Sequence, residues 1–426
     1  MKQVLIAALA SVTLSTPALA QKLAIVGGQV YTQTDQGVID NATVLINDGK
    51  IEKIITGTQV PGGYEQFDAK GKVVTPGLFG AMTSLGLVEV ESWAGTVDAS
   101  VDNARISKTG AAFDVSYALN PDSTLMDVSR IEGVTAAATT ISYTDYLFHG
   151  QGSIISVGAD EPLVKRRAFI VLDVSASAAE ASGGSRAALW VTLEQLFNEA
   201  SVLSSVPTAD KPWHGLNSRA DLPVLKKILA GDMPLVMHAS RKSDILQVLA
   251  FKQRYPDINV ILMGADQAWR VADKLAQANV PVIVNPQMNL PESFDAIGAT
   301  MQNAAILDAA GVVVAIGMET HNIRLATQHA GNAVANGLPH TSAIASLTSN
   351  PAAMFGVSDR VGSLTVGAQA DVVVWSGDPL EVTEYAEQVF MAGEAIDMTS
   401  RQTQLRDRYM KLHQSDGATP VQYIKP

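Results

Sequence analysis

Two side chains with catalytic potential follow short apolar runs in the second half of the sequence. His238 stands near the end of PLVMHAS, and Glu319 stands near the end of VVVAIGMET. An imidazole can bind a divalent metal or exchange a proton near neutral pH, and a carboxylate can do the same as a metal ligand or general base. His238 and Glu319 are therefore candidate catalytic residues. The alternatives are a hydrogen-bonded histidine without a catalytic role and an ion pair from Glu319 to Arg241 or Arg324.

Five further residues are candidates for substrate contact. FHGQGSII places His149 and Gln151 next to glycines, which let a loop approach a ligand closely, although a plain turn is the simpler interpretation of this stretch. Met82 and Ser84 follow the apolar run VTPGLFGA, where Met82 can line a pocket or fill the core. Arg241 comes shortly after PLVMHAS. We predict these five residues to bind substrate.

Other sequence features exclude several kinds of chemistry. The chain has no cysteine, which rules out disulfides, thiolate metal sites and a thiol nucleophile. It has no Gly-x-Ser-x-Gly elbow and no glycine-rich phosphate-binding fingerprint, so neither a serine hydrolase nor a nucleotide-phosphate site is expected. His321 and His329 are two helical turns apart, but no ligating residue stands at helical spacing between them. We expect these two to be solvated helix histidines.

The first twenty residues are predicted to be a secretory signal peptide. Lys2 precedes an apolar run from Val4 to Leu14, and an Ala-Leu-Ala cleavage motif ends at Ala20. The apolar run is too short for a membrane span, which takes about 20 residues. The mature protein is therefore expected in the periplasm or outside the cell, where a chain without cysteine meets no oxidative hazard. The net charge of −12 argues against nucleic acid and anionic membranes as partners.

The order of the predicted elements indicates an α/β fold with a β-rich segment at each end of the chain. The first segment contains Asn-Asp-Gly-Lys between two apolar runs, which is typical of a hairpin turn. In the middle, apolar strands alternate with helical segments such as KSDILQVLAFKQRY, a pattern that fits a (β/α)8 TIM barrel. We expect a signal peptide, the first part of a small composite β-sandwich, the barrel, the second part of the sandwich, and a C-terminal helix and tail, in residues 1–20, 21–74, 75–360, 361–400 and 401–426.

Several motifs in this layout resemble the amidohydrolase superfamily, in its imidazolonepropionase-like branch. VTPGLFGAMTSLG is similar to the first barrel strand of that family, PLVMHAS to the fifth, and VVVAIGMET to the eighth. The most specific part is GNAVANGLPHTSAIASLTSNPAAMFGVSDRVGSLTVGAQADVVVWSGDPL, which keeps the family's order of Gly-Leu, Thr-x-Asn-Pro-Ala, Gly-Ser-Leu and Ala-Asp. The resemblance implies a TIM barrel and the hydrolysis of non-peptide C–N bonds by a metal-activated water.

The resemblance also implies a set of metal ligands that this sequence keeps only in part. The family has His-x-His on the first strand, a lysine or glutamate on the fourth, one histidine each on the fifth and sixth, and an aspartate after the eighth. The corresponding residues here are Met82, Ser84, Asp173, His238, Met263 and Glu319. A thioether and a hydroxyl are poor ligands for Zn²⁺, and a catalytic zinc site usually has three protein ligands. The implied metal site is therefore incomplete.

Two functions from different classes follow from these observations. The first is an exported hydrolase of non-peptide C–N bonds in a small-molecule substrate, with a divalent metal such as Zn²⁺ held by His238 and Glu319 if the protein is active. The second is a pseudoenzyme that binds a small molecule, or stabilises an intact homologous subunit, without turnover. Neither function involves nucleic acid or a membrane span in the mature chain, and a homo-oligomer is compatible with both.

Overall fold

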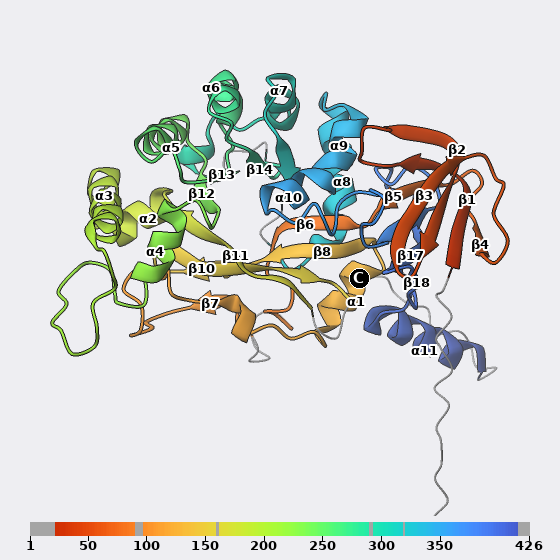
Figure 1. Cartoon of the computed structure of the whole chain (residues 1–426), viewed down its shortest axis with the longest axis horizontal. Helices are drawn as coiled ribbons and strands as arrows, with labels where there is room; N and C mark the ends of the chain where they lie inside the picture. The colour runs from red at the N-terminus through yellow and green to blue at the C-terminus, as the bar shows by residue number, and fades with distance from the viewer. Residues whose placement is uncertain (1–21, 90–96, 159–161, 289–292, 318–319, 416–426) are drawn as a thin grey trace, which may run out of the picture.

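The computed structural model describes residues 22–89, 97–158, 162–288, 293–317 and 320–415, which build a barrel and a separate β-sheet (Figure 1). The predicted α/β fold, with an eight-stranded barrel and a β-region made from both chain ends, is confirmed. Figure 1 shows the sheet at one end of the molecule and the barrel with its helices beside it. Among the described residues, no helix has the length and apolar character needed to cross a membrane.

Both ends of the chain contribute to one eight-stranded sheet, in which β5 pairs antiparallel with β16 and Val74 lies opposite Val374. The predicted hairpin is present, because β2 ends at Asn47, β3 begins at Lys50, and the two residues between them have the positive φ angles that such a tight turn requires. The strands of this sheet are β1 (Lys22–Tyr31), β2 (Val38–Asn47), β3 (Lys50–Thr56), β4 (Glu65–Asp68), β5 (Val73–Pro76), β16 (Val372–Trp375), β17 (Ala386–Met391) and β18 (Glu394–Ala395).

The barrel strands follow the order β15-β14-β13-β12-β11-β10-β8-β6, and β15 comes back into contact with β6. They are β6 (Leu78–Thr83), β8 (Val134–Thr139), β10 (Phe148–Ser156), β11 (Leu163–Asp173), β12 (Leu235–Ala239), β13 (Val260–Gly264), β14 (Val282–Val284) and β15 (Val314–Ile316). A small two-stranded sheet, β7 (Ser100–Val101) with β9 (Tyr143–Thr144), lies outside the barrel.

One barrel strand runs against the others. β10 is antiparallel to both of its neighbours, β8 and β11, whereas the remaining pairs are parallel. Only six residues separate Ser156 at the end of β10 from Leu163 at the start of β11. A connection of that length is enough for a hairpin, but a parallel pair needs a crossover of a dozen or more residues. The barrel therefore departs here from a strict alternation of strand and helix.

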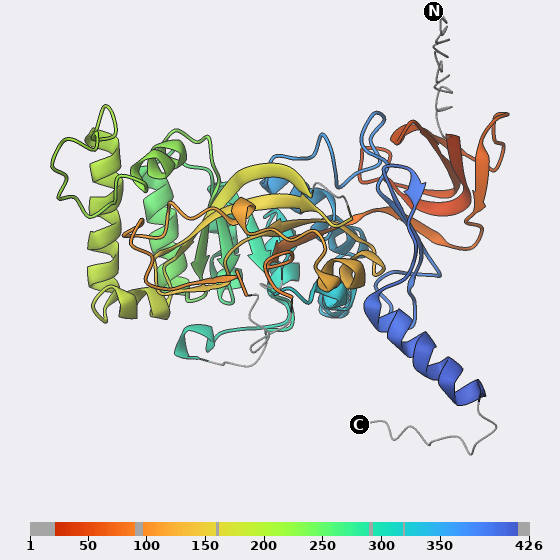
Figure 2. The same cartoon turned by 90° about the horizontal axis from the view of Figure 1, so that it is seen from below.

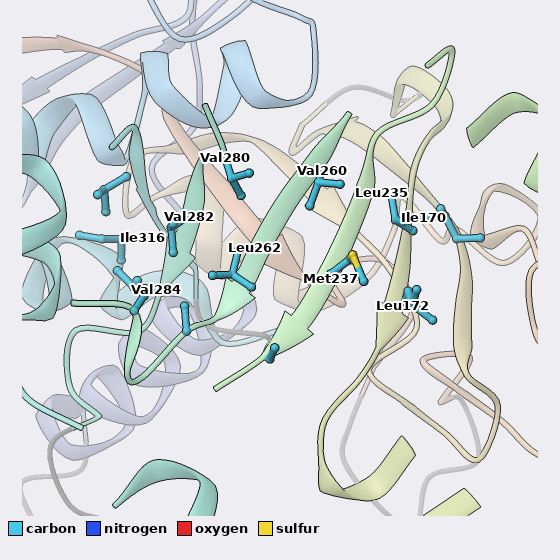
Figure 3. Packing of buried hydrophobic residues seen from close by; sticks show 14 of the residues in the cluster. Ile170, Leu172, Leu235, Met237, Val260, Leu262, Val280, Val282, Val284 and Ile316 are labelled. Carbon is cyan, nitrogen blue, oxygen red and sulfur yellow. The ribbon is translucent and has the colours of Figure 1, made fainter. Parts of the chain in front are cut away.

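Alternating side chains along the parallel strands divide the barrel into two apolar cores. Phe169 and Val171 of β11 belong to the cluster inside the barrel, whereas Ile170 and Leu172 belong to the cluster between the barrel and its helices. The period of two is the ordinary geometry of a strand, whose successive side chains point to opposite faces. Figure 3 shows the outward-facing set on neighbouring strands, where Leu235, Leu262 and their equivalents pack in a continuous layer.

Helices cover the outer face of the barrel, and short 3-10 turns join them to the strands. The helices are α1 (Thr124–Arg130), α2 (Ala176–Ala181), α3 (Arg186–Val202), α4 (Leu222–Leu229), α5 (Lys242–Arg254), α6 (Ala272–Gln277), α7 (Asn303–Ala309), α8 (Ala326–Ala335), α9 (His340–Ser346), α10 (Ser349–Met354) and α11 (Arg401–Ser415). The 3-10 turns are η1 (Val115–Tyr117), η2 (Ala268–Val271), η3 (Phe294–Ala296) and η4 (Ile323–Leu325). Figure 2 shows α11 extending away from the barrel and the sheet.

A hydrogen-bonded chain of side chains joins the sheet to the barrel. Asp378 accepts a hydrogen bond from Nε2 of His340 at 2.8 Å, and the hydroxyl of Tyr31 lies 3.4 Å from Nδ1 of the same ring. Burial, together with the negative charges of Asp378 and Asp40, raises the pKa of Tyr31, so its hydroxyl stays protonated at neutral pH. The contact ties β1 to α9 and fixes the sheet against the barrel.

Phe355 closes the floor of the barrel, at the end opposite the carboxyl ends of the parallel strands. Its ring centroid lies 4.8 Å from that of Phe169 and 6.1 Å from that of Phe79, and all three side chains are fully buried. Phe79 is the second residue of β6, and Phe169 and Phe79 both belong to the apolar cluster inside the barrel. The floor is therefore filled by packed aromatic rings, with Phe79 stacked on Phe355 and Phe169 tilted against it.

Replacing Phe355 by alanine is expected to lower the free energy of unfolding by about 3–5 kcal/mol, because the substitution leaves a cavity among rings that cannot all move inward. The measurement is the shift of the urea unfolding midpoint. The matched control is Phe294→Ala, since the Phe294 side chain is 87% exposed and loses little on truncation. Equal shifts for the two variants would contradict the described floor.

Candidate functional site

Asp173 and His238 stand side by side at the mouth of the barrel. They are the register partners at the ends of the neighbouring parallel strands β11 and β12. Oδ1 of Asp173 lies 3.4 Å from Nδ1 of His238. Each follows an inward residue of its strand by two positions, so each side chain faces the axis of the barrel. The pairing of two parallel strands is thus what creates a carboxylate–imidazole pair.

The surroundings of Asp173 keep it ionised. Its carboxylate accepts hydrogen bonds from the backbone N–H of Ser175 at 2.8 Å and from the hydroxyls of Ser175 and Ser177 at 3.0 Å each. Burial raises the pKa of Asp173, but the hydrogen bond and charge of His238 and the hydrogen bonds of Ser175 outweigh it and hold the pKa well below its usual range. A fixed negative charge beside Nδ1 orients the imidazole and stabilises its protonated form.

A glycine makes room for the histidine ring. A Cβ on Gly264 would lie 2.7 Å from Cδ2 and 2.8 Å from Nε2 of His238, closer than carbon atoms can approach. Gly264 also has a φ of +79°, in the left-handed region that favours glycine. The imidazole therefore packs directly against the end of β13, and the position after Met263 cannot carry a side chain without displacing it.

Two cavities meet at His238. The larger has a volume of about 660 Å³ and is lined by residues that include His149, Asp173 and His238. The smaller, of about 220 Å³, is lined on its inner side by His238, Met263 and Gly317. The larger volume is within the range of small-molecule sites, and the smaller volume is just below that range. The ring of His238 therefore borders both spaces in which a small ligand could be held.

Thioethers fill the inner positions where the family resemblance implies imidazoles. Met82 on the first strand and Met263 on the sixth are 1% and 4% exposed and belong to the apolar cluster inside the barrel. A Cβ on Gly317 would lie 2.5 Å from Cγ2 of Ile283 and 3.4 Å from Cβ of Met82, so these groups are tightly packed across the axis. The deep wall of the mouth is apolar at the level of His238.

The described residues do not fit the metal centre that the family resemblance implies. No group of three histidine, aspartate or glutamate side chains within the described ranges is placed to hold a metal ion. At the mouth they supply one imidazole, His238, and one carboxylate, Asp173, which faces the ring rather than a shared centre. Glu319, predicted as a catalytic residue and metal ligand, lies outside the described residues. The prediction of His238 and Glu319 as metal ligands stays a prediction.

The other predicted substrate contacts lie at different depths. His149 lines the large cavity, with Nδ1 3.2 Å from the carbonyl oxygen of Ile141. Gln151 is buried on β10, and its amide donates to the carbonyl oxygen of Phe113 at 3.4 Å. Ser84 is 2% exposed just beyond β6. His149 thus lines a described cavity. Substrate contacts by Met82, Ser84, His149 and Gln151 stay predictions.

Arg241 belongs to a charged network beside the mouth. Its guanidinium lies 2.9 Å from Asp244 and 4.0 Å from Asp295, and Arg186 pairs with the same two carboxylates. Arg241 also precedes the first residue of α5, so the network connects that helix to α3 and to the η3 segment. From this position Arg241 can stabilise the loops at the mouth. Direct contact of Arg241 with a substrate stays a prediction.

The sequence analysis missed the outer walls of the large cavity. One wall comes from the segment SYTDY that contains β9, and another from α2, which follows directly after Asp173. The missed lining residues are Ser142, Tyr143, Thr144, Asp145, Tyr146, Ser177, Ala178, Glu180 and Ala181. The position of α2 could have indicated them, because loops and helices that follow barrel strands build the mouth in this fold. No feature of the segment SYTDY predicts that it lines the same cavity as α2.

The expectation of solvated helix histidines was wrong for His329. This residue lies on α8 with 4% exposure, and burial lowers its pKa. His321 lies before the helix rather than on it. The eight-residue spacing therefore does not place the two rings on one helix face, and a buried neutral histidine packs α8 against the barrel instead.

One protein family matches part of this chain, and a curated relative matches a short segment of it. Residues 232–401 match the amidohydrolase family. A segment of 59 residues is 44% identical to the amidohydrolase tasK of Hapsidospora irregularis, which amounts to 14% of this chain and 6% of that protein. The chain thus corresponds to a small part of that relative.

Comparison with solved structures shows the fold. An amidohydrolase from Thermotoga maritima MSB8 superimposes with a TM-score of 0.77 at 23% identity, over 88% of this chain and 99% of that one. A molinate hydrolase gives a TM-score of 0.54 at 18% identity, over 89% and 95% of the two chains. A putative prolidase from Bifidobacterium longum gives 0.52 at 15% identity, over 92% and 99%.

Replacing His329 by glutamine is expected to make stability less sensitive to pH. Because burial lowers the pKa of the folded state, the unfolded chain binds a proton first as the pH falls. The stability linked to this group is complete above the unfolded pKa of about 6.5 and is lost as pH falls toward the folded pKa, at no more than about 1.4 kcal/mol per pH unit.

The check is the urea midpoint of the parent chain and the variant across this pH range. His214→Gln is the control, because His214 is exposed in a loop and its removal should leave the pH dependence unchanged. Parallel pH profiles for the parent chain and His329→Gln would show that the ring is not held neutral by burial.

Proposed function

We propose that this chain, whose residues 232–401 match the amidohydrolase family, is an exported hydrolase of a non-peptide C–N bond in a small molecule, with His238 as its proton-transfer group. The supporting observation is the Asp173–His238 pair at the barrel mouth, facing two cavities. The motif order of the C-terminal half supports the imidazolonepropionase-like branch.

The proposed chemistry follows from which ring nitrogen faces Asp173. Nδ1 is oriented by the carboxylate, so Nε2 is the atom that exchanges protons with water and substrate. Nε2 takes a proton from the attacking water as its oxygen bonds to the substrate carbon. The C–N bond then breaks, and the same proton passes to the leaving nitrogen, which restores neutral His238. Asp173 stabilises the imidazolium between the two transfers, and such general acid–base catalysis contributes about 10²–10⁴-fold in rate.

The proposal routes no step through a metal centre, since the described residues do not supply the family's ligand set. This separates it from the metal-activated water that the family resemblance implies. His238 is a potential ligand as well as a base, so metal content and activity must be measured on the same preparations.

A second candidate function is supported by the packing of Met82 and Met263. These side chains lie in the apolar interior at positions where the family has ligands. A barrel that keeps its cavities and loses its ligands can bind a small molecule, or partner an intact homologue, without turnover. In this pseudoenzyme alternative the fold and the ligand site are the same, but no reaction is catalysed.

The effect of His238→Gln on hydrolysis tests the proposed function. Amine release is measured from a panel of N-acyl amines, lactams and cyclic ureides, with metal content determined by elemental analysis of each preparation. His238→Gln is expected to lower kcat by about 10²–10⁴-fold with an unchanged thermal midpoint. Asp173→Asn, which keeps the shape and removes the charge, should lower kcat by a smaller factor and shift the pH profile.

His214→Gln serves as the matched control, because this histidine is exposed in a loop and lines neither described cavity. Turnover that survives His238→Gln would contradict the assigned role. No turnover by the parent chain, together with ligand binding, would favour the pseudoenzyme. Stoichiometric metal that disappears in His238→Gln would show that this imidazole acts as a ligand.

Export is a separate part of the proposal, supported by the leader-like first twenty residues. Expression of the full sequence in a Gram-negative host is expected to yield periplasmic protein whose N-terminal residue is Gln21. Substitution of Ala20 by arginine should block processing, because the cleavage site requires small residues. Unprocessed cytoplasmic protein from the parent sequence would contradict the proposed leader.

A further inference from the structure

The larger mouth cavity is lined by an excess of negative charge. Asp145 lines it from the segment after β9, Asp173 and Glu180 line it from the end of β11 and from α2, and its described lining contains no lysine or arginine. The smaller cavity adds Asp266 and likewise has no lysine or arginine in its described lining. Positive charge at the mouth can come from His149 or His238, and Asp173 already faces the latter.

Two of these carboxylates are available to a ligand. Asp173 is buried and committed to His238 and two serines, but Asp145 and Glu180 are both exposed to the cavity and to solvent. Among the described residues, no hydrogen bond or ion pair joins either side chain to another group. A cavity lined by charge of one sign attracts and concentrates ligands of the opposite sign.

Aromatic side chains between the carboxylates strengthen this preference. Tyr143 lines the cavity with 64% of its surface exposed. Tyr146 is held in place by a hydrogen bond from its hydroxyl to the carbonyl oxygen of Ala104 at 2.9 Å and by edge-on packing against Phe113. The face of a tyrosine ring attracts ammonium and guanidinium groups. Carboxylates and fixed rings in one cavity are thus suited to a cationic group.

We infer that the larger cavity selects a substrate bearing a positive charge, as an amine, ammonium or guanidinium group, and holds that group between Asp145, Glu180 and the tyrosines. The inference rests on the proposed function and deepens it, because the scissile bond would then lie at His238 with the cationic arm in the larger cavity. Neutral amides of the same length would lack the charge interaction, and anionic ones would be repelled.

Three acetamides with the same five-carbon arm and different terminal charge test this inference by calorimetric titration of the purified mature protein. N-acetylcadaverine carries a cation, N-pentylacetamide is neutral, and N-acetyl-6-aminohexanoate carries an anion. The cation is expected to bind about tenfold more tightly than the neutral probe, which corresponds to two or more solvent-exposed ion pairs. Added salt should reduce that preference, because the carboxylates are exposed.

Substitutions in the cavity locate the effect. Asp145→Asn and Glu180→Gln are each expected to weaken binding of the cation about threefold while leaving the neutral probe unchanged, and the double variant should abolish most of the preference. Glu394→Gln is the matched control, since Glu394 is exposed on β18 and lines neither cavity. Equal binding of the three probes, tighter binding of the neutral or anionic probe, or no detectable binding of the cation overturns the inference.

Binding and turnover separate this inference from the proposed function. A cation preference that depends on Asp145 and Glu180 in a protein without hydrolytic activity supports the inference and contradicts the hydrolase. Hydrolysis that depends on His238 but favours neutral or anionic amides supports the proposed hydrolase and contradicts the inferred cation preference.

Discussion

The alternation of side chains along the barrel strands decides which residues can take part in chemistry. Successive residues face inward and outward, so each strand brings a single inward side chain to the level of the mouth. On β11 and β12 those side chains are Asp173 and His238, each two residues beyond an apolar inward residue. On β13 the same level is occupied by Met263. A change of one residue on one strand therefore removes that strand's entire contribution to the site.

This constraint explains why the mouth of the barrel is chemically divided. Met82, Met263 and Ile283 make an apolar wall, and Asp173 and His238 make a polar one with Ser175 and Ser177 behind it. An apolar wall lowers the local dielectric constant, which strengthens the attraction between the Asp173 carboxylate and a protonated His238. The same wall offers nothing to a second charge at that level. The site is suited to one imidazole with one counter-charge, and its outer cavity supplies the remaining polar contacts.

The sequence was sufficient to predict the barrel, the β-region built from both ends and the place of His238, because each depends on local pattern. Apolar runs between helical segments indicate parallel strands, and the turn after Asn47 carries its own conformational preference. The reversed direction of β10 was not predicted, because strand composition is the same in either direction and the only signal was the short connection to β11. The burial of His329 was missed for a related reason, because the packing of α8 against the barrel decides it.

The wall of the large cavity formed by residues 142–146 was beyond sequence analysis for a different physical reason. Asp145 and Glu180 lie on short segments whose positions depend on the strands that precede them and on long-range packing. In the sequence each resembles an ordinary surface carboxylate. Only the fold shows that both line the same cavity as His238. Chemistry that depends on one residue per strand can be predicted from strand patterns, whereas chemistry that depends on loops requires the fold.

The junction between sheet and barrel shows what holds the first barrel strand in place. β5 ends at Pro76 and β6 begins at Leu78, so the sheet runs almost directly into the first barrel strand. A Cβ on the intervening Gly77 would lie 2.0 Å from the hydroxyl of Thr135, and the indole of Trp375 donates to Thr75 at 2.9 Å. These contacts fix the register of β6 from outside the mouth. With that strand held in register, the Met82 side chain packs at its inner position inside the barrel.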